Sequence, residues 1–287
     1  MARFGFGVWF FGGRLSMQKS RIFLLISLSL AAAACGQSSA DVLLAPSAAP
    51  SEGPPPDTDY LQTKTSGYGF TQIQTAHNNP IIALRTIMMV PPLPTDSGTL
   101  FFSVGLQPGG QNFDPIDNGV LEAVLSWGPS CAPNSPNAPF TSWWISAQYV
   151  NTYGNVAGYT GCHGGDGLFV EVGDPLSIHF SLDGTVWHQS VENLRDGASV
   201  GFDLDLLGQA QNYAHFWLNP VSAEPIADGE FASTTVTFAN AEPDACSPIQ
   251  RGRNDFFSNP EPSADGTQCS IDRIVLRAEG VPASTQN

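Results

Sequence analysis

The chain has 287 residues and a formal net charge of −15 at pH 7, from 26 acidic and 11 basic side chains. An acidic surface without a run of Lys or Arg repels nucleic acid and anionic lipid head groups, so both are excluded as partners. Only 13% of the residues are charged, whereas Gly and Pro number 29 and 23, a composition typical of a secreted β protein with long loops.

The N-terminal segment has the features of an export signal. Lys19 and Arg21 precede an uncharged run, residues 22–34, that is shorter than the roughly 20 residues needed to cross a hydrocarbon core. The small residues before Cys35 resemble the lipobox of bacterial lipoproteins, in which the thiol is acylated and becomes the first mature residue. Ala32 departs from this pattern, since Leu is usual there, and a plain secretory peptide cut next to Cys35 is the alternative.

Met17 opens a better-formed signal than Met1, so we expect translation to start there. The first 35 residues hold four basic and no acidic side chains, so the mature part keeps seven basic against 26 acidic ones, a charge of about −19. Residues 36–58 are rich in Ala, Ser and Pro and are predicted to form a flexible tether. We expect a lipid-anchored protein of the bacterial cell envelope, at the outer membrane, or a secreted protein if the lipobox fails.

Residues 59–287 are predicted to form a single all-β domain, because neither a second linker nor a long helical pattern is present. Short alternating or apolar runs recur between turn-forming clusters, which favours a two-sheet antiparallel β-sandwich of the concanavalin-like jelly-roll type. The clearest element is a hairpin in LSIHFSLDGTVW, with a two-residue turn of type I′ at Asp183 and Gly184. The expected strands are residues 81–90, 99–107, 119–127, 141–150, 168–172, 176–182, 185–191, 199–206, 214–218, 233–240 and 270–278.

Four cysteines follow Cys35, an even number in an oxidising compartment, so disulfides are expected. Of the three possible connectivities we predict sequential pairing, of Cys131 with Cys162 and of Cys246 with Cys269. Each bond would close a loop of a few tens of residues and stabilise the fold by about 3 to 4 kcal/mol. A zinc site is not expected, because the sequence has no Cys-x-x-Cys pair.

One carboxylate stands out on the predicted strand at 119–127. Alternation places an apolar row, from Leu121 to Trp127, on one face and leaves Glu122 between two valines on the other. An acid among apolar neighbours has a raised pKa, as general acids do. The alternative is an ordinary solvated glutamate on an open sheet face.

Two further strands combine aromatic and polar side chains on one face. Trp144 and Gln148 share a face in TSWWISAQYV, and Tyr213, His215 and Trp217 alternate with apolar residues in the later strand. An aromatic plate beside hydroxyls and amides suits a groove that binds a sugar ring or an extended peptide. Core packing is the alternative role for each aromatic ring.

Three other patterns in the sequence give weaker indications of a metal, catalytic or phosphate site. Asp114, Asp117 and Asn118 offer oxygen ligands in one loop, where a structural calcium and a plain turn are both open. A serine hydrolase is not expected, because no Gly-x-Ser-x-Gly elbow is present. GCHGGDG follows no strand-to-helix pattern, which excludes a phosphate cradle. We predict no cofactor and no catalytic metal.

Five segments of the sequence together resemble a family of secreted concanavalin-like β-sandwiches related to the glutamic peptidases. These segments are FFSVGLQ, GVLEAVLSWGPS, SWWISAQYV, VEVGDPLSIHFSLDG and TFANAEPDAC. The resemblance implies a dyad in which a glutamate activates water and a glutamine donates a hydrogen bond to the developing oxyanion. The glutamate maps to Glu242. The glutamine position falls on Glu122, a departure, because an ionised carboxylate accepts hydrogen bonds and cannot stabilise an oxyanion.

If Glu122 and Glu242 face each other, repulsion would make them share a proton and restore a donor at acidic pH. The resemblance therefore implies an acid-favouring hydrolase of an extended extracellular polymer, polypeptide or polysaccharide. Two facing carboxylates could instead cleave glycosidic bonds, with a stereochemistry set by their separation. The alternatives to an enzyme are a non-catalytic carbohydrate-binding surface lipoprotein, with Trp144, Tyr213 and Trp217 as stacking plates, and a structural envelope protein.

Overall fold

The computed structural model describes residues 69–95, 97–109, 119–134, 140–151, 156, 159–220, 227–250 and 255–278. The export signal with Met17 and Cys35, the tether at 36–58 and the candidate calcium loop at 114–118 lie outside these residues. Every described residue belongs to one compact unit, Gly53–Asn287. Within the described part, no helical segment has the length and hydrophobicity required to span a bilayer.

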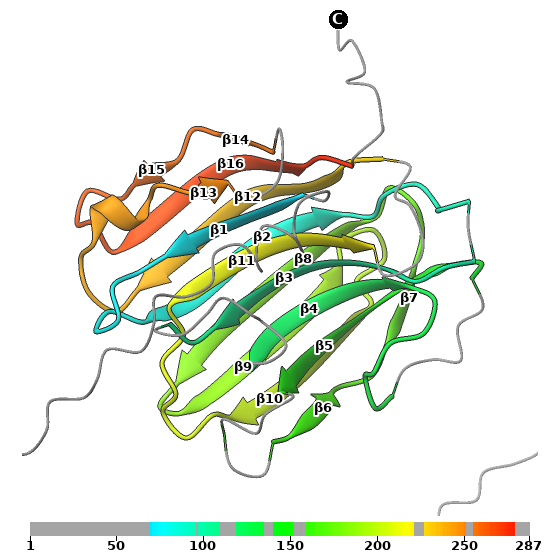
Figure 1. Cartoon of the computed structure of the whole chain (residues 1–287), viewed down its shortest axis with the longest axis horizontal. Coiled ribbons are helices and arrows are strands. Elements are labelled where there is room, and N and C mark those ends of the chain that lie inside the picture. Colours follow the sequence, from blue (N-terminus) through cyan, green and yellow to red (C-terminus); the bar gives the residue numbers. More distant parts are fainter. Residues whose placement is uncertain are drawn as a thin grey trace, which may run out of the picture. The chain divides into compact units, whose positions relative to one another are not determined.

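Two antiparallel sheets make up this unit, which confirms the predicted β-sandwich (Figure 1). The first sheet has the strand order β13-β1-β11-β3-β4-β5-β6, and β7 also pairs with β5. The second has the order β10-β9-β8-β2-β12-β16-β14, and β15 also pairs with β16. Strands that are neighbours in the first sheet come from distant parts of the chain, because β11 lies between β1 and β3.

The strands of the first sheet are β1 (Phe70–Gln74), β3 (Leu100–Gln107), β4 (Val120–Trp127), β5 (Trp143–Asn151), β6 (Gly161–Gly164), β7 (Leu168–Val170), β11 (Tyr213–Pro220) and β13 (Ile249–Gln250). Those of the second are β2 (Ile81–Met89), β8 (Pro175–Asp183), β9 (Val186–Asn193), β10 (Ser199–Asp205), β12 (Gly229–Phe238), β14 (Phe256–Ser258), β15 (Glu261–Pro262) and β16 (Gln268–Leu276). A short 3-10 turn, η1 (Pro243–Ala245), follows β12.

The alternation of apolar residues along the strands builds the core between the sheets. On β4, the row from Leu121 to Trp127 points into this core, as predicted, and Glu122 lies on the opposite face. Burying each large apolar side chain of such a row contributes about 1.5 to 3 kcal/mol. All nine residues of β5 are buried, so the outer face of the first sheet is also shielded from water there.

The predicted hairpin joins β8 to β9, but its turn is displaced by one residue. Asp183 pairs with Val186, so the two-residue loop is Gly184-Thr185. Gly184 has a φ of 61°, and Thr185 is not among the described residues with a positive φ. One positive φ at a glycine in the first loop position is the pattern of a type II′ turn, so the predicted type I′ turn is wrong.

Both predicted disulfides are confirmed. Cys131 and Cys162 join the segment after β4 to the edge strand β6, across 31 positions of the chain. Cys246 and Cys269 join the segment after η1 to β16, across 23 positions. Each bond restricts the unfolded chain and stabilises the fold by about 3 to 4 kcal/mol on the chain-entropy model.

Candidate active site

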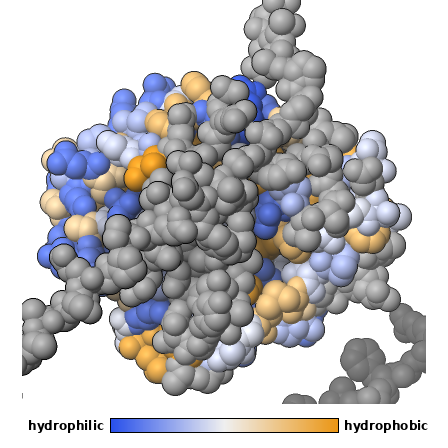
Figure 2. Space-filling view, in the orientation of Figure 1, coloured by the Kyte–Doolittle hydropathy of each residue, from blue (hydrophilic) through white to orange (hydrophobic). Residues whose placement is uncertain are grey.

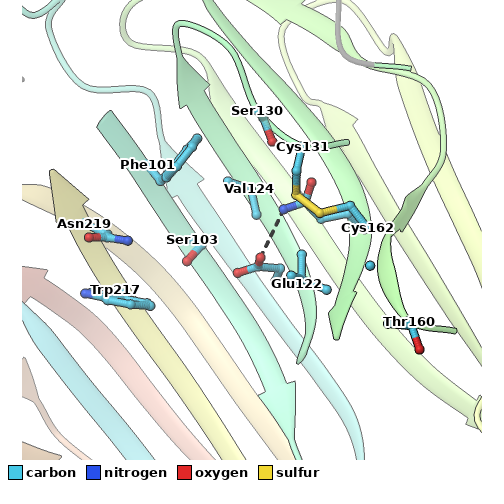
Figure 3. Close-up of a pocket in the computed structure, with 13 residues that line it drawn as sticks. Phe101, Ser103, Glu122, Val124, Ser130, Cys131, Thr160, Cys162, Trp217 and Asn219 are labelled. Carbon is cyan, nitrogen blue, oxygen red and sulfur yellow. Dashed lines mark hydrogen bonds between the residues drawn. A yellow bond between two sulfur atoms is a disulfide. The ribbon is translucent and has the colours of Figure 1, made fainter. Parts of the chain in front are cut away.

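A cavity of about 470 Å³ lies on the outer face of the first sheet. Figure 3 shows Glu122 between the Cys131–Cys162 disulfide on one side and Trp217 and Asn219 on the other. Seen from the side of Figure 1, the described surface of the molecule mixes hydrophilic residues with scattered hydrophobic ones (Figure 2). The cavity is lined by Phe101, Ser103, Glu122, Val124, Ser130, Cys131, Gln148, Val150, Thr160, Gly161, Cys162, Trp217 and Asn219.

Strand register places polar residues from distant segments side by side across this face. Glu122 on β4 is paired with Gln148 on β5 in one direction and with Gly105 on β3 in the other. Gly105 is paired in turn with His215 on β11, and His215 with Gln72 on β1. These five residues form a continuous row at right angles to the strands, which we call the polar row.

Glu122 is half-buried at the wall of the cavity, and two neighbouring side chains hydrogen-bond to it. Gln148 donates from Nε2 to Glu122 Oε1 over 3.0 Å, and the side chain of Ser103 also hydrogen-bonds to the carboxyl group. Burial raises the pKa of Glu122 to about 7, because desolvation penalises the charged form more than these two hydrogen bonds favour it. Near neutral pH the carboxyl group is therefore present in both protonation states, which suits proton transfer.

Gln148 has hydrogen-bonding capacity left for a ligand. Its side chain is 3% exposed, and its Oε1 has no hydrogen-bond partner among the described residues. The amide nitrogen carries two N–H groups, of which one is directed to Glu122. The main-chain oxygen of Gln148 accepts from Gln189 Nε2 at 3.3 Å, which anchors this part of β5 to the second sheet. The amide is thus a fixed polar group in the cavity wall.

His215 reaches toward Glu122 over Gly105. A β-carbon placed on Gly105 would lie 2.7 Å from His215 Cε1 and 2.9 Å from Glu122 Cβ, so both side chains occupy the space that the glycine leaves. His215 is fully buried, and this burial lowers its pKa to about 3. The imidazole is therefore uncharged at neutral pH.

Glu242 has a different setting from the one predicted. It precedes η1, and its carboxylate accepts from the Ala76 main-chain nitrogen at 2.8 Å and from Asn79 Nδ2 at 2.7 Å. These bonds connect the turn between β1 and β2 to the start of η1. Glu242 is not among the described residues that line the cavity, so the structure does not bring the two glutamates together there.

The predicted binding residues separate into two groups. Gln148 and Trp217 line the cavity, whereas Trp144, Tyr213 and His215 do not. Trp144 is fully buried, packs against Ala132 and donates from Nε1 to the Gly128 oxygen at 2.9 Å. Tyr213 is 9% exposed. The proposed role of Trp144 and Tyr213 as stacking plates therefore has no support from the described wall of the cavity, whereas Gln148 and Trp217 lie in it.

Several lining residues were not singled out from the sequence. Ser103 and Phe101 lie on β3, on the face opposite its apolar core row, and alternation alone could have identified them. Cys131 and Cys162 were predicted as a disulfide but not as a cavity wall. Asn219 carries no pattern that would mark it, because its place depends on the pairing of β11 with β3.

The described residues contain no group of three or more His, Cys, Asp or Glu side chains arranged to hold a metal ion. All four cysteines after Cys35 are in disulfides and so cannot serve as thiolate ligands. The polar side chains among the described lining residues are the carboxyl group of Glu122, the amides of Gln148 and Asn219, and the hydroxyls of Ser103, Ser130 and Thr160.

No protein-family model matches the sequence, and no curated protein matches it either. Among solved structures, scytalido-glutamic peptidase with a peptide-based transition-state analog has a TM-score of 0.46 and 11% identity, covering 72% of this chain and 98% of that chain. SCP-B, a member of the eqolisin family of peptidases in complex with the tripeptide Ala-Ile-His, has a TM-score of 0.44 and 12% identity over the same shares. The likeness is one of fold. The CBM2 module of the evolved Dit of Lactobacillus casei BL23 phage J-1 has a TM-score of 0.33 and 8% identity, covering 72% of this chain and 65% of that one.

Proposed function

We propose that this protein hydrolyses peptide bonds, with Glu122 as general base and Gln148 as the donor to the developing oxyanion. The observation that carries the proposal is the 3.0 Å hydrogen bond between Gln148 Nε2 and Glu122 Oε1 at the wall of a cavity. A glutamate and a glutamine are the two residue types that the resemblance to glutamic peptidases implies. In this proposal Glu122 is the glutamate that activates water, a role that the resemblance gave to Glu242. Gln148 is the glutamine, whose position the resemblance placed at Glu122.

The reaction follows from the two groups. Ionised Glu122 removes a proton from a water molecule, whose oxygen bonds to the peptide carbonyl carbon while the carbonyl π electrons move to the carbonyl oxygen. The second N–H of Gln148 donates to this oxyanion. The tetrahedral intermediate then collapses: the carbonyl re-forms, the carbon–nitrogen bond breaks, and Glu122 returns its proton to the leaving amine.

The pKa of Glu122 changes the expected pH range. A general base acts in its ionised form, and burial raises the pKa of Glu122 to about 7. Hydrolysis is therefore proposed to rise from mildly acidic to neutral pH, in place of the acid-favouring activity expected from a pair of glutamates. A base whose pKa is close to the working pH combines a useful ionised fraction with sufficient basicity.

The lining residues favour a carbonyl substrate over a glycosidic bond. Glycoside hydrolysis normally uses two carboxyl groups about 5 to 9.5 Å apart. Glu122 is the one carboxyl group among the described lining residues. Apolar walls at Phe101, Val124 and Trp217 suit an apolar side chain of an extended polypeptide.

We further propose that this activity takes place outside the cytoplasm, at the bacterial outer membrane, with lipid on Cys35 as the anchor. The two disulfides support a place outside the cytoplasm, because such bonds persist in oxidising compartments. Labelling with a radioactive fatty acid and mass analysis of the mature N-terminus test the anchor. A mature protein with an unmodified amino terminus at or after Cys35 would contradict it.

A non-catalytic carbohydrate-binding protein is the second candidate. Trp217 and Asn219 both line the cavity, and an indole beside a side-chain amide can stack on a sugar ring and hydrogen-bond its hydroxyls. In this case Trp217→Ala weakens glycan binding, and Glu122→Gln has no turnover to remove.

The deciding experiment uses protein purified from the cell envelope and a mixture of fluorogenic peptides between pH 5 and 9. We expect cleavage by the wild type and by Glu242→Gln, whose carboxylate lies outside the cavity, and none by Glu122→Gln. A glycan array is probed with the same preparations. Absence of peptide cleavage by the wild type, or equal cleavage by Glu122→Gln, would overturn the proposed hydrolase.

A further inference from the structure

Gly105 occupies an unusual position for a glycine, in the interior of β3 and at the centre of the polar row. A glycine inside a strand is destabilising relative to alanine and often marks a place where another group approaches the backbone closely. At Gly105 a β-carbon would lie 2.5 Å from the Leu121 oxygen as well as within 3 Å of atoms of His215 and Glu122. Any other residue would therefore displace its neighbours.

Because Gly105 on β3 has no side chain, side chains from β4 and β11 come close together although these strands are not direct neighbours. His215 on β11 and Glu122 on β4 are each paired with Gly105, one on either side. Side chains two strands apart normally have a third side chain between them. Here Cε1 of His215 and Cβ of Glu122 both adjoin the space over the glycine, so the imidazole flanks Glu122 on the side opposite Gln148.

We propose that His215 is a positioning residue for Glu122: its ring fills the space over Gly105, excludes water from it and keeps the carboxyl group against Gln148. The expected effect on the rate of hydrolysis rests on the proposed hydrolase, whereas the expected effect on the pKa of Glu122 does not. His215 is not among the described lining residues of the cavity, so it acts through Glu122 and not on the substrate.

The surroundings indicate that this effect is one of packing and dehydration. His215 is fully buried and stays uncharged, because burial lowers its pKa to about 3. It is the one other titratable side chain of the polar row, whose remaining members are Gln72, Gly105 and Gln148. Tyr213 lies on the same face of β11, one row away, where it is paired with Gln107.

The test measures the pKa of Glu122 directly, by carbon-13 NMR of protein labelled at the glutamate side chains, with Glu122→Gln to assign the signal. His215→Val introduces a β-branched residue, which suits a strand, but shortens the side chain and removes the ring. We expect water to enter and the pKa of Glu122 to fall by about one unit or more. His215→Phe is the matched control, because it keeps a ring in the same space, and should leave the pKa within a few tenths of the wild-type value.

The outcomes separate this inference from the proposed function. A folded His215→Val protein with an unchanged Glu122 pKa would overturn the positioning role, even if the protein is an active hydrolase. The same holds if His215→Phe shifts the pKa as far as His215→Val does. If His215→Val does not fold, His215→Leu provides the shortened, non-ring side chain for the same comparison. In an active protein, His215→Val should lower kcat about tenfold with little change in KM, because the base is misplaced while the lining residues remain.

Discussion

Gln148 and Glu122 are direct partners in the ladder between β4 and β5, and the amide of one donates to the carboxyl group of the other over 3.0 Å. Because both residues lie inside strands, their separation is fixed by the sheet and does not depend on the conformation of a loop. A functional pair on rigid elements needs little reorganisation when a substrate binds. The arrangement accordingly predicts large effects from small changes at either residue.

Replacing Gln148 by Ala removes the proposed oxyanion donor. We expect kcat for peptide hydrolysis to fall by about 10² to 10³, as for the loss of one oxyanion-hole donor, with a smaller change in KM. Steady-state kinetics on a fluorogenic peptide measure both constants. Gln72→Ala is the matched control, since Gln72 is also a buried glutamine of the polar row but lies beyond His215, on β1. Equal losses in the two variants would show that the effect comes from the sheet and not from the donor.

The pH dependence of hydrolysis follows from the role of Glu122. As a base it must be ionised, and its pKa is raised to about 7 by burial. The value of kcat/KM should therefore increase with pH up to about 7 and level off above it. Initial rates between pH 5 and 9 in buffers of constant ionic strength provide the profile. A rate that increases toward pH 4 would instead indicate that Glu122 acts in its protonated form.

Stability should show the opposite trend with pH. In the unfolded chain Glu122 ionises near its ordinary value of 4.5, whereas in the folded protein it stays protonated up to about 7. Between these values the unfolded state loses its proton first, so the free energy of unfolding falls as pH rises, by up to about 3 kcal/mol. Urea unfolding at pH 4.5 and 8 should show a smaller pH-dependent loss in Glu122→Gln than in the wild type. Glu192→Gln, at an exposed position of β9, should keep the wild-type difference.

The parts of the fold that the sequence predicted are those governed by local alternation. The core row of β4 and the outward position of Glu122 follow from a period of two residues along a single strand. The missed strands β1, β6, β13, β14 and β15 have two to five residues, too few for such a period to be distinctive. The turn between β8 and β9 was misplaced because Asp183 extends the ladder by one pair, which depends on its partner Val186.

The site could be predicted only in part, because it depends on strand order. Alternation within each strand identified Glu122 and Gln148, but it does not indicate that the two residues are directly opposed. Gly105 and His215 are 110 positions apart and become neighbours only because β11 is inserted between β1 and β3. Glu242 was assigned by resemblance, and its hydrogen bonds to Ala76 and Asn79 connect segments that are remote in the sequence.

The two disulfides should differ in their effect on function. Cys131 and Cys162 both line the cavity, on the side opposite Trp217, whereas neither Cys246 nor Cys269 is among its described lining residues (Figure 3). Replacing either pair by alanines removes a constraint worth about 3 to 4 kcal/mol, so urea denaturation should show similar losses of stability.

Only the Cys131→Ala/Cys162→Ala protein should also lose substrate affinity, with KM for a fluorogenic peptide raised several-fold, because the segment after β4 is no longer held against β6. The Cys246→Ala/Cys269→Ala protein serves as the control for stability alone and should keep the wild-type KM at a temperature where both variants are folded. An equal change of KM in the two proteins, or no change in either, would show that the Cys131–Cys162 disulfide stabilises the fold but does not contribute to substrate binding.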